Sequence, residues 1–409
     1  MSKQLDEILQ VQDAPVWDSS VERVEFHTIN PSNPSALQNN DIIHFAMNQS
    51  DTLVLLESSY FLVSGRLAKK DADGALSAST KTKFVKGGIL FLFSRAEIKI
   101  DNARIQEITE PGYVCLPRIK ATYNDWAVRH LQLMGMDDDF GMEGDGTFHS
   151  VVIPFRVLFT LGEDFKKVLV NSKLEVLLTR ARSDDNAIIQ SSEETYSLNI
   201  SKVQFRLPFV QVDDVARLNF LKIIEKDEAL PLVFRSWDLY QYPELPKSTS
   251  HTWTIKTSTQ LEKPRYVIVF FQTDRSHNKL KDASLYDHCN LRDVKLKLNN
   301  ESYPYENLNQ DFSKNDYSLF YHAYCEFSRV YSGDLSPFLN LKTYKSHSPL
   351  FIIDCSRQKE KLPFGPVDVR LEFESTDPFP AKTTANCIII HDTAFEYSPL
   401  RGLVKKYES

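Results

Sequence analysis

The chain has 409 residues, of which 42% are hydrophobic and 25% are charged, and its formal net charge is −7. This length exceeds what one hydrophobic core usually fills, so two domains are expected. The composition is typical of a soluble globular protein, and the acidic balance argues against a surface that binds nucleic acid as a whole.

The first residues of the chain are polar and acidic, and no apolar core follows them, so no signal peptide is expected. No run approaches the roughly 20 apolar residues that span a bilayer. The five cysteines are odd in number and dispersed. They indicate reduced thiols and folding in the cytoplasm or nucleus.

Residues 1–17 are expected to form an N-terminal arm. Leu5, Ile8 and Leu9 make a short apolar stripe, enough for one or two helical turns that need a partner to be stable. Trp17 is expected to anchor the arm. These four residues are the candidate assembly residues of the chain.

Strand patterns begin at residue 20 and alternate with turns rich in Asn and Pro. The expected strands cover 21–26, 41–45, 52–56 and 59–65. Residues 69–84, rich in Lys, Asp, Ala, Ser and Thr, are expected to form an exposed loop.

The next stretch joins two kinds of strand pattern. The apolar run 89–93 is typical of a strand buried on both faces, and the alternation over 97–101 is typical of a strand with one wet face. Asp101 and Asn102 then favour a turn, because short polar side chains bond their own backbone and tolerate positive φ.

A helix is predicted over 119–136, followed by an acidic, glycine-containing segment at 137–147. That segment lacks the ligand spacing and closing Glu of a calcium loop, so a solvated surface loop is expected. Strands at 151–159 and 173–180, a short helix at 163–170 and a strand at 196–209 are expected to complete the first unit.

A connecting helix is predicted near 213–227, where Asp213 is a suitable N-cap and Val215, Leu218 and Leu221 share one side. The second unit then repeats the pattern of strands and contains a helix rich in Tyr and Phe. Its expected strands lie at 231–237, 252–256, 266–272, 350–355, 366–374 and 386–396, and its helix at 317–331.

Strand-like segments recur in the same order in the two halves. The four matched pairs are 97–102 with 295–300, 151–154 with 351–354, 174–178 with 369–373, and 196–200 with 387–391. Alternation is common, so each pair alone is weak, and the shared order carries the inference of two copies of one β domain.

The expected fold is all-β with a few short helices: two tandem eight-stranded jelly rolls, a double jelly roll. The domains are expected to cover 18–210 and 211–409, after the arm at 1–17.

Several stretches resemble double jelly-roll capsid-like proteins, the major capsid proteins of Polinton-type and adintovirus-type DNA viruses and their copies in invertebrate genomes. These stretches are 234–238, 257–267, 351–357 and 390–400, with 91–105 in the first unit. At the turn, Asn102-Ala103 replaces the commoner Asn-Gly, and a turn with positive φ at both positions would be strained by Ala.

The resemblance implies a major capsid protein: a homotrimer of pseudo-hexameric outline that tiles an icosahedral shell with neighbouring capsomers and minor or penton proteins. It implies a virion location after synthesis in the host cytoplasm, with nuclear assembly left open.

No catalytic site and no cofactor-binding motif is expected. His288, Cys289, His322 and Cys325 could supply four zinc ligands but lie on different segments, so core or surface roles are favoured. Cys355 is interpreted as a buried thiol rather than a nucleophile. The basic pieces 263–265 and 405–406 are interpreted as solvated faces, with no nucleic-acid site.

Two functions of different classes remain: a structural capsid protein, and a two-domain β-sandwich that binds carbohydrate or acts on glycosides. A carboxylate pair for the second cannot be judged from sequence alone. A cluster of exposed Trp with acids would favour it, and the four Trp residues are instead scattered, at 17, 126, 237 and 253.

Overall fold

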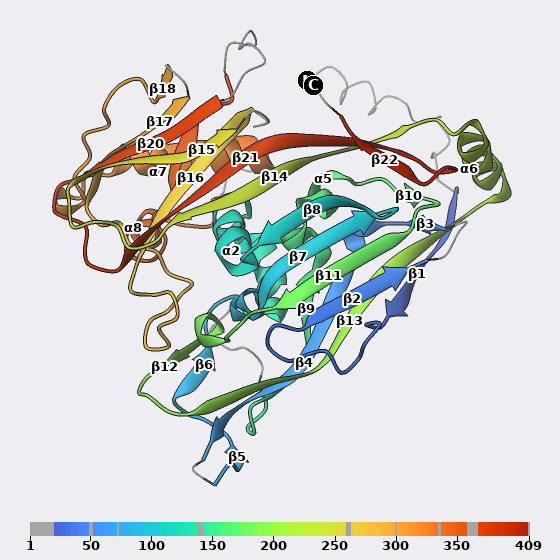
Figure 1. The fold of residues 1–409 in the computed structure, drawn as a ribbon, viewed down its shortest axis with the longest axis horizontal. Helices are drawn as coiled ribbons and strands as arrows, with labels where there is room; N and C mark the ends of the chain where they lie inside the picture. The colour runs from blue at the N-terminus through green and yellow to red at the C-terminus, as the bar shows by residue number, and fades with distance from the viewer. Residues whose placement is uncertain are drawn as a thin grey trace, which may run out of the picture.

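The computed structural model describes residues 20–48, 52–71, 73–136, 142–258, 263–298, 301–333, 337–357 and 367–407. The candidate assembly residues Leu5, Ile8, Leu9 and Trp17 lie outside these ranges, as does the start of the acidic segment at 137–141. The described chain is mainly β, and its two halves each form two facing sheets (Figure 1).

The first roll pairs its strands in the order β1–β13–β4–β9 in one sheet and β2–β11–β7–β8 in the other. The bounds are β1 (Val21–Ile29), β2 (Ile42–Met47), β4 (Tyr60–Lys70), β7 (Phe93–Ile100), β8 (Ala103–Thr109), β9 (Thr147–Pro154), β11 (Leu174–Arg180) and β13 (Tyr196–Val212). The short strands are β3 (Leu53–Val54), β5 (Leu76–Ser77), β6 (Thr82–Phe84), β10 (Leu169–Val170) and β12 (Ile188–Gln190).

The second roll repeats this order as β14–β21–β16–β19 and β15–β20–β17–β18. The bounds are β14 (Leu230–Tyr242), β15 (Ser250–Ser258), β16 (Pro264–Thr273), β17 (Leu291–Leu298), β18 (Glu301–Tyr303), β19 (Phe351–Asp354), β20 (Val367–Ser375) and β21 (Thr383–Ser398), with β22 (Leu403–Lys406) added to β21. The two orders match strand for strand, which defines the tandem jelly rolls expected from the sequence.

The helices lie mostly in the connections between strands. They are α2 (Pro111–Thr122), α3 (Asp125–His130), α4 (Phe155–Leu158), α5 (Thr160–Asp164), α6 (Asp214–Lys226), α7 (Ser318–Ser332) and α8 (Leu341–His347). Short 3-10 turns are η1 (Leu56–Ser58), η2 (Gly88–Leu92), η3 (Leu131–Met134), η4 (Asp185–Ala187) and η5 (Phe312–Lys314). The two rolls carry helices at equivalent places in the chain. In the first roll α2 and α3 lie between β8 and β9, and in the second roll α7 and α8 lie between β18 and β19.

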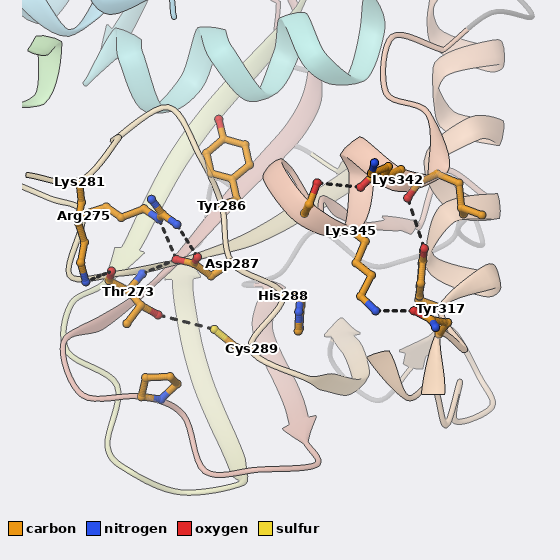
Figure 2. Close-up of a pocket in the computed structure, with 14 residues that line it drawn as sticks. Thr273, Arg275, Lys281, Tyr286, Asp287, His288, Cys289, Tyr317, Lys342 and Lys345 are labelled. Atoms are coloured by element: carbon orange, nitrogen blue, oxygen red, sulfur yellow. Dashed lines mark hydrogen bonds and ion pairs between the residues drawn. The ribbon is translucent and has the colours of Figure 1, made fainter. Parts of the chain in front are cut away.

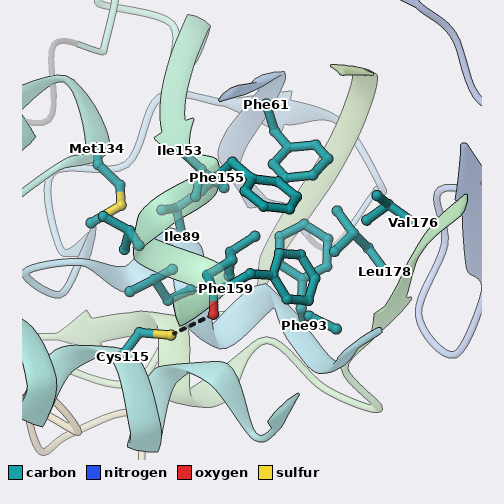
Figure 3. Packing of buried hydrophobic residues seen from close by; sticks show 14 of the residues in the cluster. Phe61, Ile89, Phe93, Cys115, Met134, Ile153, Phe155, Phe159, Val176 and Leu178 are labelled. Atoms are coloured by element: carbon teal, nitrogen blue, oxygen red, sulfur yellow. Dashed lines mark hydrogen bonds between the residues drawn. The ribbon is translucent and has the colours of Figure 1, made fainter. Parts of the chain in front are cut away.

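The core of the first roll is aromatic. Phe45 on β2 faces Phe61 on β4, with ring centroids 5.7 Å apart, and this contact joins the two sheets. Phe155 and Phe159 of the α4 segment close the same cluster, with ring centroids 4.9 Å apart (Figure 3). The second roll is closed in the same way, by Phe271 and Phe373 on its two sheets.

The repeat predicted from sequence joins equivalent strands in all four of its pairs, and the registers of the first and third pairs agree with each other. Val176 pairs with Ile98 in the first roll, and Leu371 pairs with Leu296 in the second, so 98 and 296 occupy equivalent positions. The fourth pair joins equivalent strands in the wrong register. Phe205 and Ile389 are equivalent through their partners on β4 and β16, so Cys387 corresponds to Val203 rather than to Tyr196.

The turn after β7 differs from the expectation at Ala103. Asp101 and Asn102 both have positive φ, of 49° and 67°, and Ala103 already pairs with Ile100 as the first residue of β8. The turn therefore uses two residue types that tolerate the left-handed region, and the alanine sits in an extended strand without strain.

Four other local predictions were wrong. The apolar run 89–93 is the buried turn η2 up to Leu92, not a strand, and the 69–84 segment contains β5 and β6 with Phe84 buried. The helix at 119–136 begins earlier, at Pro111, and is interrupted at Tyr123. The helix at 163–170 is instead α4 and α5, which end at Asp164.

The connecting helix and the aromatic helix are confirmed. Asp213 caps α6 by accepting a hydrogen bond from the backbone N–H of Ala216 at 2.7 Å. The aromatic helix α7 buries Phe320, Tyr324 and Phe327 on one side. In the described part of the chain, no helix is long and apolar enough to cross a membrane.

Candidate assembly surfaces and the joint between the rolls

The two rolls share one continuous interface, formed by β14 of the second roll against β8, α2 and α5 of the first (Figure 1). Apolar residues cross it in both directions. Leu232 and Phe234 of β14 belong to the core cluster of the first roll, whereas Ile108 and Val114 belong to that of the second. The rolls are thus packed together as one body rather than tethered by a linker.

A bidentate ion pair anchors this joint. The Arg235 guanidinium on β14 donates to both carboxylate oxygens of Asp164 at the end of α5, with its Nε 3.0 Å from Oδ2. The Arg235 backbone N–H donates to the same carboxylate at 2.8 Å. The guanidinium also lies 3.6 Å from the centre of the Tyr331 ring on α7. Planar Arg–carboxylate geometry of this kind fixes orientation as well as adding energy.

Arg118 on α2 lies fully buried beside this pair. It donates to the backbone carbonyl of Arg156 at 2.9 Å and to that of Val157. Its Nε is 3.9 Å from the Glu163 carboxylate, whose pKa burial raises while the Arg118 charge opposes the shift. These two carbonyl oxygens and the Glu163 carboxylate offset part of the cost of burying this cation.

Lys120 is a second buried cation of the joint. Its ammonium donates to the backbone carbonyl of Ser284 in the second roll and lies 4.2 Å from the centre of the Tyr286 ring. Burial lowers the pKa of Lys120 to about 7, with Asp282 opposing that shift and Lys86 and Arg275 adding to it. The Lys120 amine therefore binds its proton more weakly in the folded protein than in the unfolded chain.

Replacing Lys120 by Met is expected to remove a pH dependence of stability. Between pH 7 and the ordinary lysine pKa of 10.5, the unfolded chain binds one more proton than the folded protein, so the wild type gains stability as pH rises. Below pH 7 both states are protonated and the gain ends. The difference in unfolding free energy between the wild type and Lys120→Met should grow by roughly 2 kcal/mol from pH 7 to 9.

Urea titrations of both proteins at several pH values measure this difference. If the unfolding free energies of the two proteins change with pH in the same way between pH 7 and 9, the protonation of Lys120 does not change on unfolding.

A cavity of about 900 Å³ lies among the loops of the second roll (Figure 2). Two of the cations that line it are paired. Arg275 donates to Asp287 through Nη2 at 2.7 Å, and Lys345 donates to the carbonyl of Phe312 at 2.9 Å. His288 stacks on Phe312, with ring centroids 4.6 Å apart, and burial lowers its pKa.

The four candidate zinc ligands are not brought together. His288 and Cys289 line the cavity, whereas His322 and Cys325 lie on α7. Within the described ranges, no group of three or more His, Cys, Asp or Glu side chains could hold a metal ion.

The cysteine thiols are held in their protonated form. Burial raises the pKa of Cys355 and of Cys289 to about 12, and that of Cys115 to about 11. Cys355 donates to the carbonyl of Pro264 at 3.4 Å, as a buried structural thiol does. A reactive cysteine needs the opposite shift, toward the thiolate.

The connecting helix α6 presents an apolar stripe to solvent. Val215 is 68% exposed and Leu218 is 57% exposed, and no residue of α6 is buried. The helix adjoins the start of the described chain, because the backbone N–H of Asp213 donates to the carbonyl of Ser20 at 3.0 Å.

The joint could not be predicted from the sequence pattern. Arg118 and Lys120 are two charged residues inside the otherwise apolar stretch 113–121, and such residues indicate buried partners without identifying them. Asp164 and Arg235 are far apart in sequence, and only the packing of the rolls brings them together.

The chain belongs to the double jelly roll-like domain family, whose model matches residues 91–395. No curated protein matches it by sequence. Among solved structures it resembles the PBCV-1 capsid protein VP54, with a TM-score of 0.61 and 9% identity over 97% of this chain and 99% of that one.

Two further solved structures extend the comparison. The Faustovirus major capsid protein has a TM-score of 0.59 and 8% identity over 96% of this chain and 94% of that one. The mavirus major capsid protein has a TM-score of 0.57 and 11% identity, over 97% and 92% respectively. At such identities these likenesses establish the fold, and the family resemblance drawn from the sequence is confirmed.

Proposed function

We propose that this chain is a major capsid protein: a homotrimeric capsomer that tiles the icosahedral shell of a DNA virus. The observation that carries the proposal is the presence of two jelly rolls of matching strand order, packed against each other through shared apolar residues. Two similar barrels per chain turn a threefold assembly into a near-sixfold one, which fills a hexagonal lattice with one gene product. The family and its solved capsid relatives support it.

In this proposal residues 18–210 and 211–409 are the two barrels, and the role of the chain is structural rather than catalytic. The protein resides in the virion after synthesis in the host cell. Its partners are two further copies, neighbouring capsomers, and minor proteins at the vertices.

The carbohydrate-binding or glycoside-active alternative finds no support in the described tryptophans. Trp237 is buried in the joint, where its indole N–H donates to the Tyr331 hydroxyl at 3.2 Å. Trp253 packs against Tyr242 on a different sheet, with ring centroids 5.8 Å apart. Neither of these two side chains contributes to a shared exposed aromatic platform.

The N-terminal arm with Leu5, Ile8, Leu9 and Trp17 is proposed as an assembly element that contacts a neighbour or the shell interior. An arm of this length is unstable as an isolated helix. The exposed apolar residues of α6 beside Ser20 support contacts at this end of the subunit.

Deleting residues 1–17 is expected to reduce the yield of shells while leaving the subunit folded. The described core of each roll lies outside the arm, so the melting temperature should change by no more than about 2 °C. Negative-stain microscopy counts the particles, and a thermal melt monitors the fold. Shells that form equally well without the arm would contradict its role in assembly.

A further inference from the structure

The cavity among the loops of the second roll has a charge opposite to that of the whole chain. The chain carries a formal net charge of −7, whereas the described residues that line the cavity include four cationic side chains and one carboxylate. The cations are Arg275, Lys281, Lys342 and Lys345, and the carboxylate is that of Asp287 (Figure 2). A concave site lined by one sign of charge attracts ligands of the opposite sign.

Two of these four cations are balanced by carboxylates. Arg275 donates to Asp287 through Nε at 2.9 Å and through Nη2 at 2.7 Å, and the backbone N–H of Thr273 donates to the same carboxylate at 2.8 Å. The Lys281 ammonium lies 3.2 Å from the carboxylate of Asp274, which is not part of the lining. The charge excess of the cavity therefore comes from the two lysines of α8.

Lys342 and Lys345 lie three residues apart on α8, and residues at this spacing share one face of a helix. Lys345 donates to the carbonyl of Phe312 at 2.9 Å and to the side-chain carbonyl of Asn315 at 2.5 Å. Both acceptors are neutral, so they do not compensate the ammonium charge. Within the described chain, the ammonium of Lys342 has no hydrogen-bond or ion-pair partner. Two uncompensated ammonium groups thus line one cavity.

Apolar and aromatic side chains line the cavity as well. Tyr286 and Tyr317 are buried there, and the half-exposed Leu341 and Pro380 add apolar surface. Cavities of roughly 300–1,000 Å³ that combine apolar walls with a few polar groups are typical of sites for small organic ligands. At about 900 Å³ this cavity lies within that range. Its lining is therefore complementary to a molecule with an apolar body and an anionic head group.

We propose that this cavity binds a small organic anion, with its acidic head group at the two lysines of α8 and its ring against the two tyrosines. The inference goes beyond the proposed function and does not rest on it, because one chain supplies the whole lining. The ring of Tyr286 also lies 4.2 Å from the Lys120 ammonium of the first roll, so the ligand would sit beside the joint. Binding to the folded chain should raise its melting temperature.

The test uses two fluorescent probes that differ in one charge. Anilinonaphthalene sulfonate carries a sulfonate on an aromatic body, and phenylnaphthylamine has the same aromatic body without the sulfonate. Fluorescence titration of the full chain measures the affinity for each. Lys345→Met is expected to weaken binding of the sulfonate by about tenfold. Lys342→Met, at an exposed position, is expected to weaken it by about threefold. The affinity for the uncharged probe should not change.

Lys83→Met, at an exposed position on β6 in the first roll, is the matched control and should bind both probes as the wild type does. A thermal melt monitors the fold of each variant. Lys345 also holds Phe312 and Asn315, so Lys345→Met can lose stability for that reason. Lys342→Met removes no such contact and keeps the test decisive.

Three outcomes would overturn the proposal. The wild type could fail to bind the sulfonate, or the folded lysine variants could bind it as tightly as the wild type, which would place the probe elsewhere. An equal loss of affinity for both probes would mean that the lysines act through packing rather than charge. None of these outcomes bears on the proposed capsomer, which is tested by the mass of the assembly.

Discussion

Arg235→Ala is expected to lower the free energy of unfolding by about 2–4 kcal/mol, because it leaves the partly buried Asp164 carboxylate without its guanidinium. The loss also removes the stacking of Arg235 on Tyr331, which lies within the second roll beside the joint. Arg235→Lys should restore only part of the stability, since an ammonium cannot reproduce the bidentate geometry.

Urea denaturation followed by tryptophan fluorescence measures this effect, because Trp237 lies in the same joint. Arg265→Ala is the matched control. Its pair with Asp392 is about half exposed, at 2.7 Å, and is expected to contribute less than about 1 kcal/mol. Equal effects of the two substitutions would contradict a special role for the joint.

Phe155→Ala is expected to cost about 3–5 kcal/mol, because it opens a cavity in the centre of the first roll. The ring lies 4.9 Å from that of Phe159 and 5.9 Å from that of Phe205, measured between centroids (Figure 3). The packing is tight: a Cβ added at Gly162 would come within 2.5 Å of the Phe155 ring.

Chemical denaturation of the full chain checks this value. The exposed Leu133→Ala serves as the control and should change stability by no more than about 0.5 kcal/mol. A cost below about 1 kcal/mol for Phe155→Ala would mean that this aromatic cluster does not hold the first roll together.

The sequence predicted the register best where a sheet has one wet face. β7 and β17 alternate, so a shift by one residue would turn their buried side chains to solvent, and 98 and 296 could be matched correctly. β21 is buried on both faces over 387–390, so alternation is lost and nothing in its pattern specifies the register. The mismatch of Cys387 follows from this difference.

The apolar run 89–93 shows a second limit of sequence reasoning. Apolar residues alone do not distinguish a buried strand from a buried turn. The glycines decide it: Gly87 has a φ of 66°, and a Cβ at Gly88 would lie 2.4 Å from the carbonyl oxygen of Ala187. Those constraints belong to the close approach of another segment, which the local pattern does not contain.

The joint could not be predicted for a different reason. Its stabilising contacts are made by residues that no sequence pattern distinguishes, such as Asp164 and Arg235. These residues become partners only when the two rolls pack together. The internal repeat did predict two similar barrels.

Mass photometry of the purified full-length protein tests the central claim most directly. The account predicts a dominant species at three times the chain mass of 47.1 kDa, with larger shells as concentration rises. A single species at the mass of one chain, at every salt concentration and pH tried, would contradict a capsomer and favour the carbohydrate-binding alternative.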